Sequence, residues 1–238
     1  MKIEKAVTEF TYSNQRIKIE GYHVDDLIFD RIVTGKTFYE YKLLEKARSL
    51  NLEGAYVDVG ANIGNHSIFF NRFCGSTVVY SFEIDEKIFA LLKKNMEKNC
   101  LENTYHLEEI GILDKKGFVD ISETNHLNAG MTKIVNVEGT QRKVNTLDNL
   151  LGSVKNIVLI KIDVEGLELE IINGAQKILE SQSPVIFAEL ATDTEFKFFK
   201  NELSKFGYTT DNVNYAATPT YLFQKTEVFH EKQAQKPV

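Results

Sequence analysis

Short runs of β-branched and aromatic residues alternate with longer amphipathic segments from about Gly54 onward. The short runs are typical of buried strands, whereas segments with apolar residues every three or four positions are typical of helices. The predicted strands are residues 55–59, 77–82, 104–107, 157–162 and 185–189. The predicted helices between them are residues 65–73, 86–99 and 168–180. This alternation predicts an α/β protein with a mostly parallel sheet and helices on both faces.

Two parts of the chain depart from this rhythm. Residues 117–144 contain strand-like pieces at 117–121 and 141–144, which predict an insertion with its own hairpin. The C-terminal part is predicted to form one helix and two strands, at residues 194–206, 208–215 and 220–224. Because no crossover helix separates the last two strands, we expect them to pair antiparallel.

Length and composition indicate one domain with an extension. The chain has 238 residues, of which 43% are hydrophobic and 26% charged, as in an ordinary globular protein. We expect residues 1–50 to form a helical or irregular extension, with 29–50 helical in part. Residues 51–229 would form the main domain, and residues 230–238 a polar tail.

Charge and cysteine content argue against several classes of function. A net charge of -6 does not suit a nucleic-acid partner, because phosphate binding depends on clustered Lys and Arg. Cys74 and Cys100 form no CxxC pair and the histidines no cluster at ligand spacing, so no disulfide and no metal site are expected. The N-terminus mixes acids and bases, and no apolar run approaches the roughly 18 residues of a membrane span. We therefore expect a cytoplasmic protein.

The segment Val57-Asp-Val-Gly-Ala-Asn-Ile-Gly-Asn-His66 is typical of a buried strand that runs into a tight turn and then a helix. Gly60 and Gly64 would allow the turn and the close approach of a ligand, and the start of the helix offers unpaired N–H groups. Asp58 changes the expected ligand, because a carboxylate at the strand end repels a pyrophosphate and attracts an α-amino group. The turn therefore predicts a site for a positively charged ligand.

Two further predicted strands end in acids. Glu83 follows the strand at 77–82, where it could accept both hydroxyls of a ribose, each charged hydrogen bond contributing roughly 1.5–3 kcal/mol. Asp163 and Glu165 follow the strand at 157–162. Ligands of an open α/β sheet lie beyond the carboxyl ends of its strands, so these acids should face one crevice together with Asp58.

Lys161 lies inside an apolar predicted strand, where an unpaired ammonium group would be costly. Glu189, at the end of the adjoining predicted strand, is the expected partner. Such a pair could serve the structure alone or the site as well.

These motifs resemble, in their order and spacing, the FkbM-type family of S-adenosylmethionine-dependent methyltransferases. The resemblance spans roughly residues 38–189 and rests on Asp58-Val-Gly-Ala-Asn-Ile-Gly64, Phe82-Glu83, Thr146-Leu-Asp148, Lys161-Ile-Asp-Val-Glu-Gly166 with Glu168, Gly174-Ala175 and Glu189. It implies a class I methyltransferase fold, a Rossmann-like sheet of seven strands whose last strand is antiparallel. It also implies S-adenosyl-L-methionine as the cofactor.

The resemblance assigns residues to parts of the cofactor. Those expected around its methionine part are Asp58, Gly60, Asn62 and Gly64, and the neighbouring Ala61 and Asn65 are also expected to bind the cofactor. Glu83, followed by Ile84, would hold the ribose, and Glu109 and Ile110 would lie near the adenine. Asp163 is expected to contact the cofactor as well.

The implied reaction is attack of a substrate oxygen on the sulfonium methyl group, on a sugar hydroxyl or similar secondary alcohol of a small molecule or glycan. An alcohol is not acidic at neutral pH, so a base is needed. Asp163 is the expected base, because its strand end should lie closest to the sulfonium, and Glu165, His66 and His126 are alternatives. The loop 123–131 would line the acceptor pocket.

Two other functions stay open at this point. A nicotinamide-dependent oxidoreductase would carry a third glycine after Gly64 and a Tyr-x-x-x-Lys on a helix. Here Tyr221 and Lys225 fall on the last predicted strand, and Asn62 replaces the middle glycine. A non-catalytic binding module would not need the acids at 58, 83 and 163, and their presence argues against it.

Overall fold

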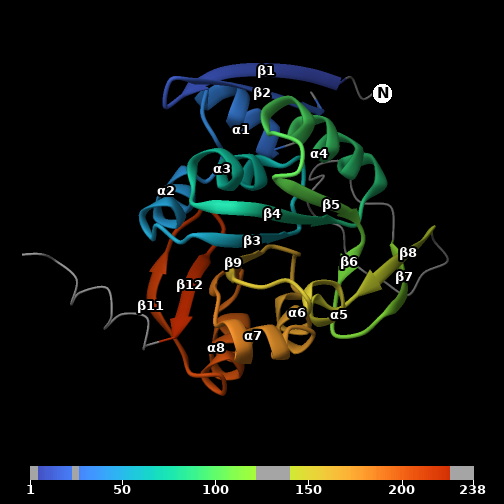
Figure 1. Cartoon of the computed structure of the whole chain (residues 1–238), viewed down its shortest axis with the longest axis vertical. Helices are drawn as coiled ribbons and strands as arrows, with labels where there is room; N and C mark the ends of the chain where they lie inside the picture. Colours follow the sequence, from blue (N-terminus) through green and yellow to red (C-terminus); the bar gives the residue numbers. More distant parts are fainter. Residues whose placement is uncertain (1–4, 23–26, 122–139, 226–238) are drawn as a thin grey trace, which may run out of the picture.

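A seven-stranded sheet forms the centre of the protein, as seen in a computed structural model that describes residues 5–22, 27–121 and 140–225 (Figure 1). Its strand order is β11-β12-β10-β9-β3-β4-β5. The bounds are β3 (Gly54–Val59), β4 (Ser76–Glu83), β5 (Tyr105–Glu109), β9 (Ile157–Ile162), β10 (Val185–Glu189), β11 (Tyr208–Asn214) and β12 (Thr220–Lys225). Among these seven strands β12 runs in the opposite direction to the other six, so it pairs antiparallel with both β10 and β11. The predicted class I methyltransferase fold, with its antiparallel last strand, is confirmed.

Helices cover both faces of this sheet (Figure 1). On one face lie α1 (Leu27–Gly35), α2 (Tyr41–Ser49), α3 (Asn65–Phe73) and α4 (Glu86–Asn99), and on the other α5 (Leu147–Leu151), α6 (Glu168–Asn173), α7 (Gln176–Gln182) and α8 (Asp193–Ser204). The alternation of side chains along β3 explains the two apolar layers, since Tyr56 packs in the first and Val57 in the second. The predicted helices at 65–73 and 86–99 have the observed bounds.

The single helix predicted over 168–180 is wrong, because the chain breaks at Gly174 into α6 and α7. A Cβ at Gly174 would lie 2.2 Å from the carbonyl oxygen of Leu113, so the backbone is pressed against another segment here. The carboxylate of Asp148 accepts hydrogen bonds from the amides of Lys177 and Ile178, both at 3.0 Å, and thereby caps the new helix. These partners are distant in sequence, so the break is a tertiary effect.

The insertion forms a small sheet of its own, in the order β6-β8-β7. Its strands are β6 (Gly111–Ile112), β7 (Gly117–Ile121) and β8 (Thr140–Asn145), and β7 pairs antiparallel with β8 as the predicted hairpin. Residues 122–139 lie outside the described residues, and with them His126 and the predicted acceptor loop 123–131.

The N-terminal extension contains the predicted helical part, but residues 5–22 are neither helical nor irregular. They form the antiparallel hairpin of β1 (Lys5–Tyr12) and β2 (Gln15–Tyr22), in which Ile17 and Ile19 are buried. The alternation around these two residues was the signal for a strand. Asn95 and Asn99 of α4 then hold β2: their side-chain oxygens accept the amides of Glu20 and Lys18, at 2.7 and 3.0 Å.

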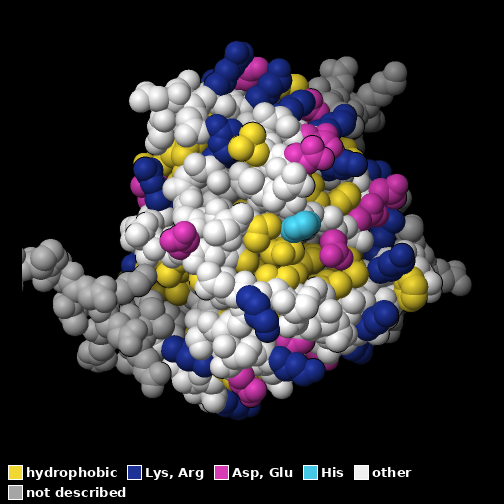
Figure 2. Space-filling model, in the orientation of Figure 1, with side chains coloured by type: hydrophobic (Ala, Val, Ile, Leu, Met, Phe, Trp, Pro, Cys, Tyr) yellow, Lys and Arg dark blue, Asp and Glu magenta, His cyan; other side chains and the backbone are white. Residues whose placement is uncertain are grey.

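Figure 2 shows basic and acidic side chains interspersed over one face of the molecule, with apolar side chains gathered at its middle. Within the described ranges, no helix is long and apolar enough to cross a membrane.

Candidate active site

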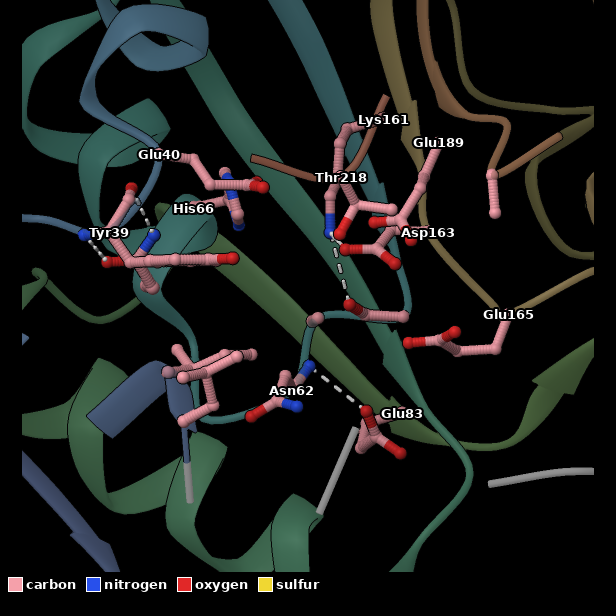
Figure 3. Close-up of a pocket in the computed structure, with 16 residues that line it drawn as sticks. Tyr39, Glu40, Asn62, His66, Glu83, Lys161, Asp163, Glu165, Glu189 and Thr218 are labelled. Atoms are coloured by element: carbon pink, nitrogen blue, oxygen red, sulfur yellow. Dashed lines mark hydrogen bonds and ion pairs between the residues drawn. The ribbon is translucent and has the colours of Figure 1, made fainter. Parts of the chain in front are cut away.

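A cavity of about 300 Å³ lies where β3, β4, β9 and β10 end (Figure 3). Its walls are formed by Leu27, Ile28, Tyr39, Glu40, Gly60, Ala61, Asn62, Asn65, His66, Glu83, Lys161, Asp163, Glu165, Glu189, Ala191 and Thr218. This is the edge of an open α/β sheet at which ligands bind. Five of the lining residues carry carboxyl groups, so the cavity is acidic.

The cavity brings together many of the predicted site residues from separate strands. Those that line it are Gly60, Ala61, Asn62, Asn65, Glu83, Asp163, Glu165 and the alternative base His66. Other predicted cofactor contacts are not among the lining residues, namely Asp58, Gly64, Ile84, Glu109 and Ile110. Glu83, Asp163 and Glu165 therefore meet beside the turn as expected, whereas Asp58 and the predicted adenine contacts do not line the cavity.

The glycine turn is shaped by contacts within the protein. Gly60 has φ 74°, and a Cβ there would lie 1.8 Å from the carbonyl oxygen of Asp163. Gly64 has φ 92° at the start of α3, and a Cβ there would lie 2.9 Å from Leu92 of α4. The positive φ favours glycine at both positions, and at Gly60 the backbone carbonyl also leaves no room for a Cβ, which lets the loop after β3 touch the loop after β9.

The N–H groups of this turn are also used within the chain. Those of Gly60 and Ala61 donate to the carbonyl oxygen of Phe82, and that of Asn62 donates to Oε2 of Glu83. The N–H group of Ile63 donates to Oδ1 of Asn62, and that of Gly64 donates to the carbonyl oxygen of Ala61. A pyrophosphate is held by such amides in dinucleotide-binding proteins. In this turn the N–H groups of residues 60–64 all donate to other atoms of the chain, so none is free to bind a pyrophosphate. This disfavours a dinucleotide ligand.

Glu83 reaches the cavity from the end of β4 with 9% of its surface exposed. Its Oε2 accepts the amide of Asn62 at 3.0 Å and its Oε1 that of Asp85 at 2.9 Å. Burial raises the pKa of Glu83 to about 7, against the opposite effect of these two amides. Each carboxylate oxygen has a second lone pair, so both can still accept a ligand hydroxyl.

Lys161 is bound by two carboxylates, but not by the one predicted. Its Nζ lies 3.1 Å from Oδ2 of Asp163 and 3.5 Å from Oδ1 of Asp58, and it donates to the carbonyl oxygen of Gly60 at 3.3 Å. The expected pairing with Glu189 is wrong, because the register of β9 with β3 sets Lys161 directly beside Asp58. Burial acts to lower the pKa of Lys161, but the two carboxylates outweigh it and raise that pKa.

Asp58 itself has no exposed surface. Its Oδ2 accepts the hydroxyl of Ser67 at 2.6 Å, and its Oδ1 faces Lys161. A ligand could touch this carboxylate only if one of those side chains moved. Its observed contacts are with the chain, and its predicted contact with a ligand amino group stays a prediction.

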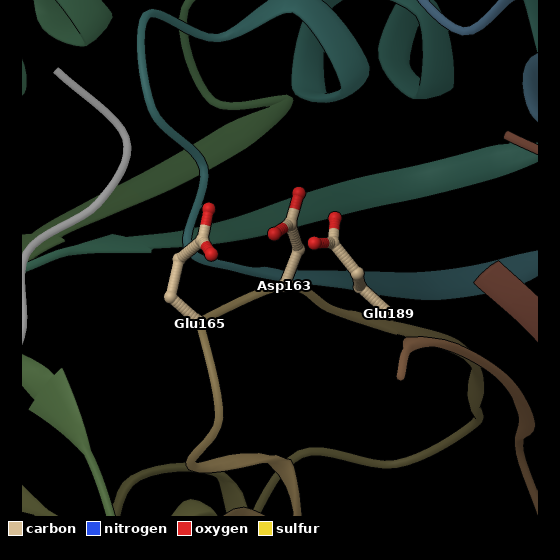
Figure 4. Close-up of side chains that lie close together, drawn as sticks. All are labelled: Asp163, Glu165 and Glu189. Atoms are coloured by element: carbon tan, nitrogen blue, oxygen red, sulfur yellow. The ribbon is translucent and has the colours of Figure 1, made fainter. Parts of the chain in front are cut away.

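Three carboxyl groups, Asp163, Glu165 and Glu189, form what we call the acid group (Figure 4). One oxygen of each lies within 4.8 Å of the others. Burial acts to raise the pKa of Asp163, but Lys161 outweighs it and holds that pKa below its ordinary value. Burial, together with Asp163, raises the pKa of Glu189 to about 9. Close carboxylates also suit divalent cations, but here the Lys161 ammonium already lies against Asp163, and we assign no metal.

The loop after β9 is held in an unusual conformation by Glu168. Glu165 has φ 58° and Gly166 φ 101°, both in the left-handed region. The buried carboxylate of Glu168 accepts the amides of Val164 at 3.3 Å and Gly166 at 3.1 Å. These bonds offset the backbone strain at Glu165, whose side chain lines the cavity.

Part of the cavity wall was missed by sequence reasoning. Glu40, at φ 55°, places its Oε2 3.0 Å from Nε2 of His66, and both side chains are buried. Asn65 fixes the same segment, since its side chain exchanges two hydrogen bonds with the backbone of Tyr39, at 2.9 and 3.0 Å. Residues 36–40 show no periodic pattern, so these contacts left no local signal.

Comparison with known proteins agrees with the fold. The family model named methyltransferase FkbM domain matches residues 58–216. Hexuronic acid methyltransferase AglP of Haloferax volcanii is 32% identical over 148 residues, which are 60% of this chain and 58% of AglP. The matched part thus spans little more than half of that relative. Methyltransferase FkbM from Methylobacillus flagellatus KT superposes with a TM-score of 0.59 at 16% identity, over 83% of this chain and 52% of that one, which shows the shared fold.

Proposed function

Because the chain belongs to the methyltransferase FkbM domain family, we propose that it transfers a methyl group from S-adenosyl-L-methionine to a sugar hydroxyl or similar secondary alcohol. The observation that carries this proposal is the acidic cavity at the carboxyl ends of the central strands. A cavity lined by carboxyl groups favours a cation, and this methyl donor has a positively charged sulfur and an ammonium group.

The residues present fit this cofactor. The carboxyl groups around the cavity belong to Glu40, Glu83, Asp163, Glu165 and Glu189. Glu83 would accept the two ribose hydroxyls on its remaining lone pairs, and the turn at 60–64 would lie along the methionine part. When bound, S-adenosylmethionine supplies a methyl group that its positive sulfur has already activated.

The work left for the chain is to orient the acceptor, exclude water and accept a proton. The acid group is suited to the last task, since it is the set of carboxyl groups around the end of β9. Asp163 was the base expected from the sequence. Its contact with Lys161 weakens it in this role, because a carboxylate held in the ionised form has little affinity for a proton.

A sugar acceptor, as a small molecule or as part of a glycan, is supported by the relative AglP, whose name gives hexuronic acid as its substrate. Because the match covers little more than half of AglP, the acceptor is part of the proposal.

Isothermal titration with S-adenosylmethionine, S-adenosylhomocysteine and NAD tests the proposal. We expect the first two to bind and NAD not to bind, since the N–H groups of the turn at 60–64 already donate within the chain and are not free for a pyrophosphate. Binding of NAD alone would overturn the proposal in favour of an oxidoreductase. Binding of none of the three would favour a non-catalytic module.

A further inference from the structure

Glu189 is the member of the acid group that lies at the end of β10, beside Asp163 and at the cavity wall. It ends β10, and the pairing of Ala188 with Ile162 sets it beside Asp163, the residue that follows β9. Only 8% of its surface is exposed, and that surface lines the cavity. Glu189 therefore faces both the other acids and the cavity.

The charges around Glu189 are unevenly distributed. Asp163 and Glu165 face it from the loop after β9, Tyr39 approaches from the segment before α2, and on β12 its neighbour is the uncharged Thr220. The Lys161 ammonium lies on the far side of Asp163, 3.1 Å from that carboxylate. Asp163 and Glu189 have carboxyl oxygens within 4.8 Å of each other, and Glu189 is buried, so the two cannot both be ionised at low cost and they share one proton. Since Lys161 holds Asp163 ionised, the proton resides on Glu189.

A positive charge in the cavity would reverse this preference, because it favours the ionised form of a nearby carboxyl group. Resting on the function proposed above, we propose that Glu189 gives up its proton when the cationic methyl donor binds, and that the carboxylate so formed is the base for the acceptor hydroxyl. The base would then exist only in the complex with the methyl donor.

The transfer step balances on this assignment. The acceptor oxygen forms a bond to the methyl carbon while the bond from that carbon to sulfur breaks, and the electron pair of the broken bond stays on sulfur. The hydroxyl proton passes to the carboxylate of Glu189. This returns Glu189 to its protonated form beside a product whose sulfur is neutral.

Proton release on binding tests the proposal without an acceptor. Titration calorimetry near pH 7 in buffers of different ionisation enthalpy counts the protons released. We expect S-adenosylmethionine to release roughly one proton more than S-adenosylhomocysteine, whose sulfur is uncharged. The affinity for S-adenosylmethionine should accordingly rise with pH, by up to about tenfold more per pH unit than the affinity for S-adenosylhomocysteine. Equal proton release by the two ligands in the unchanged protein would overturn the proposal.

Two matched variants locate the proton. Glu189→Gln should bind both ligands without the difference in proton release. Glu97→Gln, which changes an exposed glutamate of α4 that does not line the cavity, should keep the difference. A difference that persists in Glu189→Gln would assign the proton to another group and overturn the proposal. The comparison of ligands in the unchanged protein decides the matter even if Glu189→Gln does not fold. Failure of both ligands to bind that protein would instead refute the proposed function itself.

Discussion

The ammonium nitrogen of Lys161 lies 3.1 Å from Oδ2 of Asp163, the second residue after it in the chain. The same nitrogen is 3.5 Å from the fully buried carboxylate of Asp58. One lysine thus stabilises two carboxylates, of which Asp58 is fully buried and Asp163 is partly exposed at the cavity wall. It also sets the charge within the acid group, because it favours an ionised Asp163 and leaves the shared proton to Glu189.

Lys161→Met is expected to reduce the free energy of unfolding by about 3 to 5 kcal/mol, because it leaves buried carboxylates without their cation. Urea unfolding at neutral pH measures this change. The control is Lys18→Met, which removes a half-exposed ammonium 3.0 Å from Glu9 and should matter far less. Equal losses in the two variants would contradict the role given to Lys161.

Glu189→Gln should change how stability depends on pH. Folding raises the pKa of this carboxyl from 4.5 to about 9, so its protonated form stabilises the fold at low pH. That contribution is lost as the pH rises from the lower value to the higher one. Between about pH 6 and pH 8 the unchanged protein should lose about 2 to 3 kcal/mol more than the variant.

Urea unfolding of both proteins at the two pH values gives this difference. Glu180→Gln, on the exposed side of α7, controls for the loss of one acidic side chain from the chain as a whole. The raised pKa would be refuted by a Glu189→Gln variant whose stability follows that of the unchanged protein at both pH values.

Glu83→Ala should weaken the binding of S-adenosylhomocysteine by about tenfold or more, since charged hydrogen bonds to a ribose contribute roughly 1.5–3 kcal/mol each. Titration calorimetry measures the dissociation constant. Glu97→Ala, which removes an exposed glutamate from α4, is the control and should bind as the unchanged protein does. Unaltered affinity in Glu83→Ala would rule out its contact with the ribose.

Gly60→Ala should destabilise the protein by about 2 to 4 kcal/mol, because the added Cβ would lie 1.8 Å from the carbonyl oxygen of Asp163 and the backbone has φ 74°. Gly35→Ala, where the nearest atom would be 3.5 Å away on Thr37, is the matched control and should stay within about 1 kcal/mol. Chemical unfolding of both variants compares them. Similar stabilities would mean that the two loops are not held together at Gly60.

Local signals account for the elements that were predicted well. The helix α4 has the predicted bounds, because the side chain of Asp85 caps it and its apolar residues recur at helical spacing. The break at Gly174 had no such signal, since it depends on Asp148 and Leu113 from other parts of the chain. The hairpin of residues 5–22 had a local alternation, which the expectation of an irregular extension overlooked.

The sequence by itself determined that acids stand at the ends of four parallel strands, and parallel strands bring their carboxyl ends to one edge. It could not determine which of those acids binds Lys161. Both strands beside β9 offer a carboxylate, Asp58 on β3 and Glu189 on β10, and only the strand order and register place the ammonium next to Asp58 and Asp163. The tertiary structure decided this because an ion pair depends on distances across strands, which periodicity along one strand does not contain.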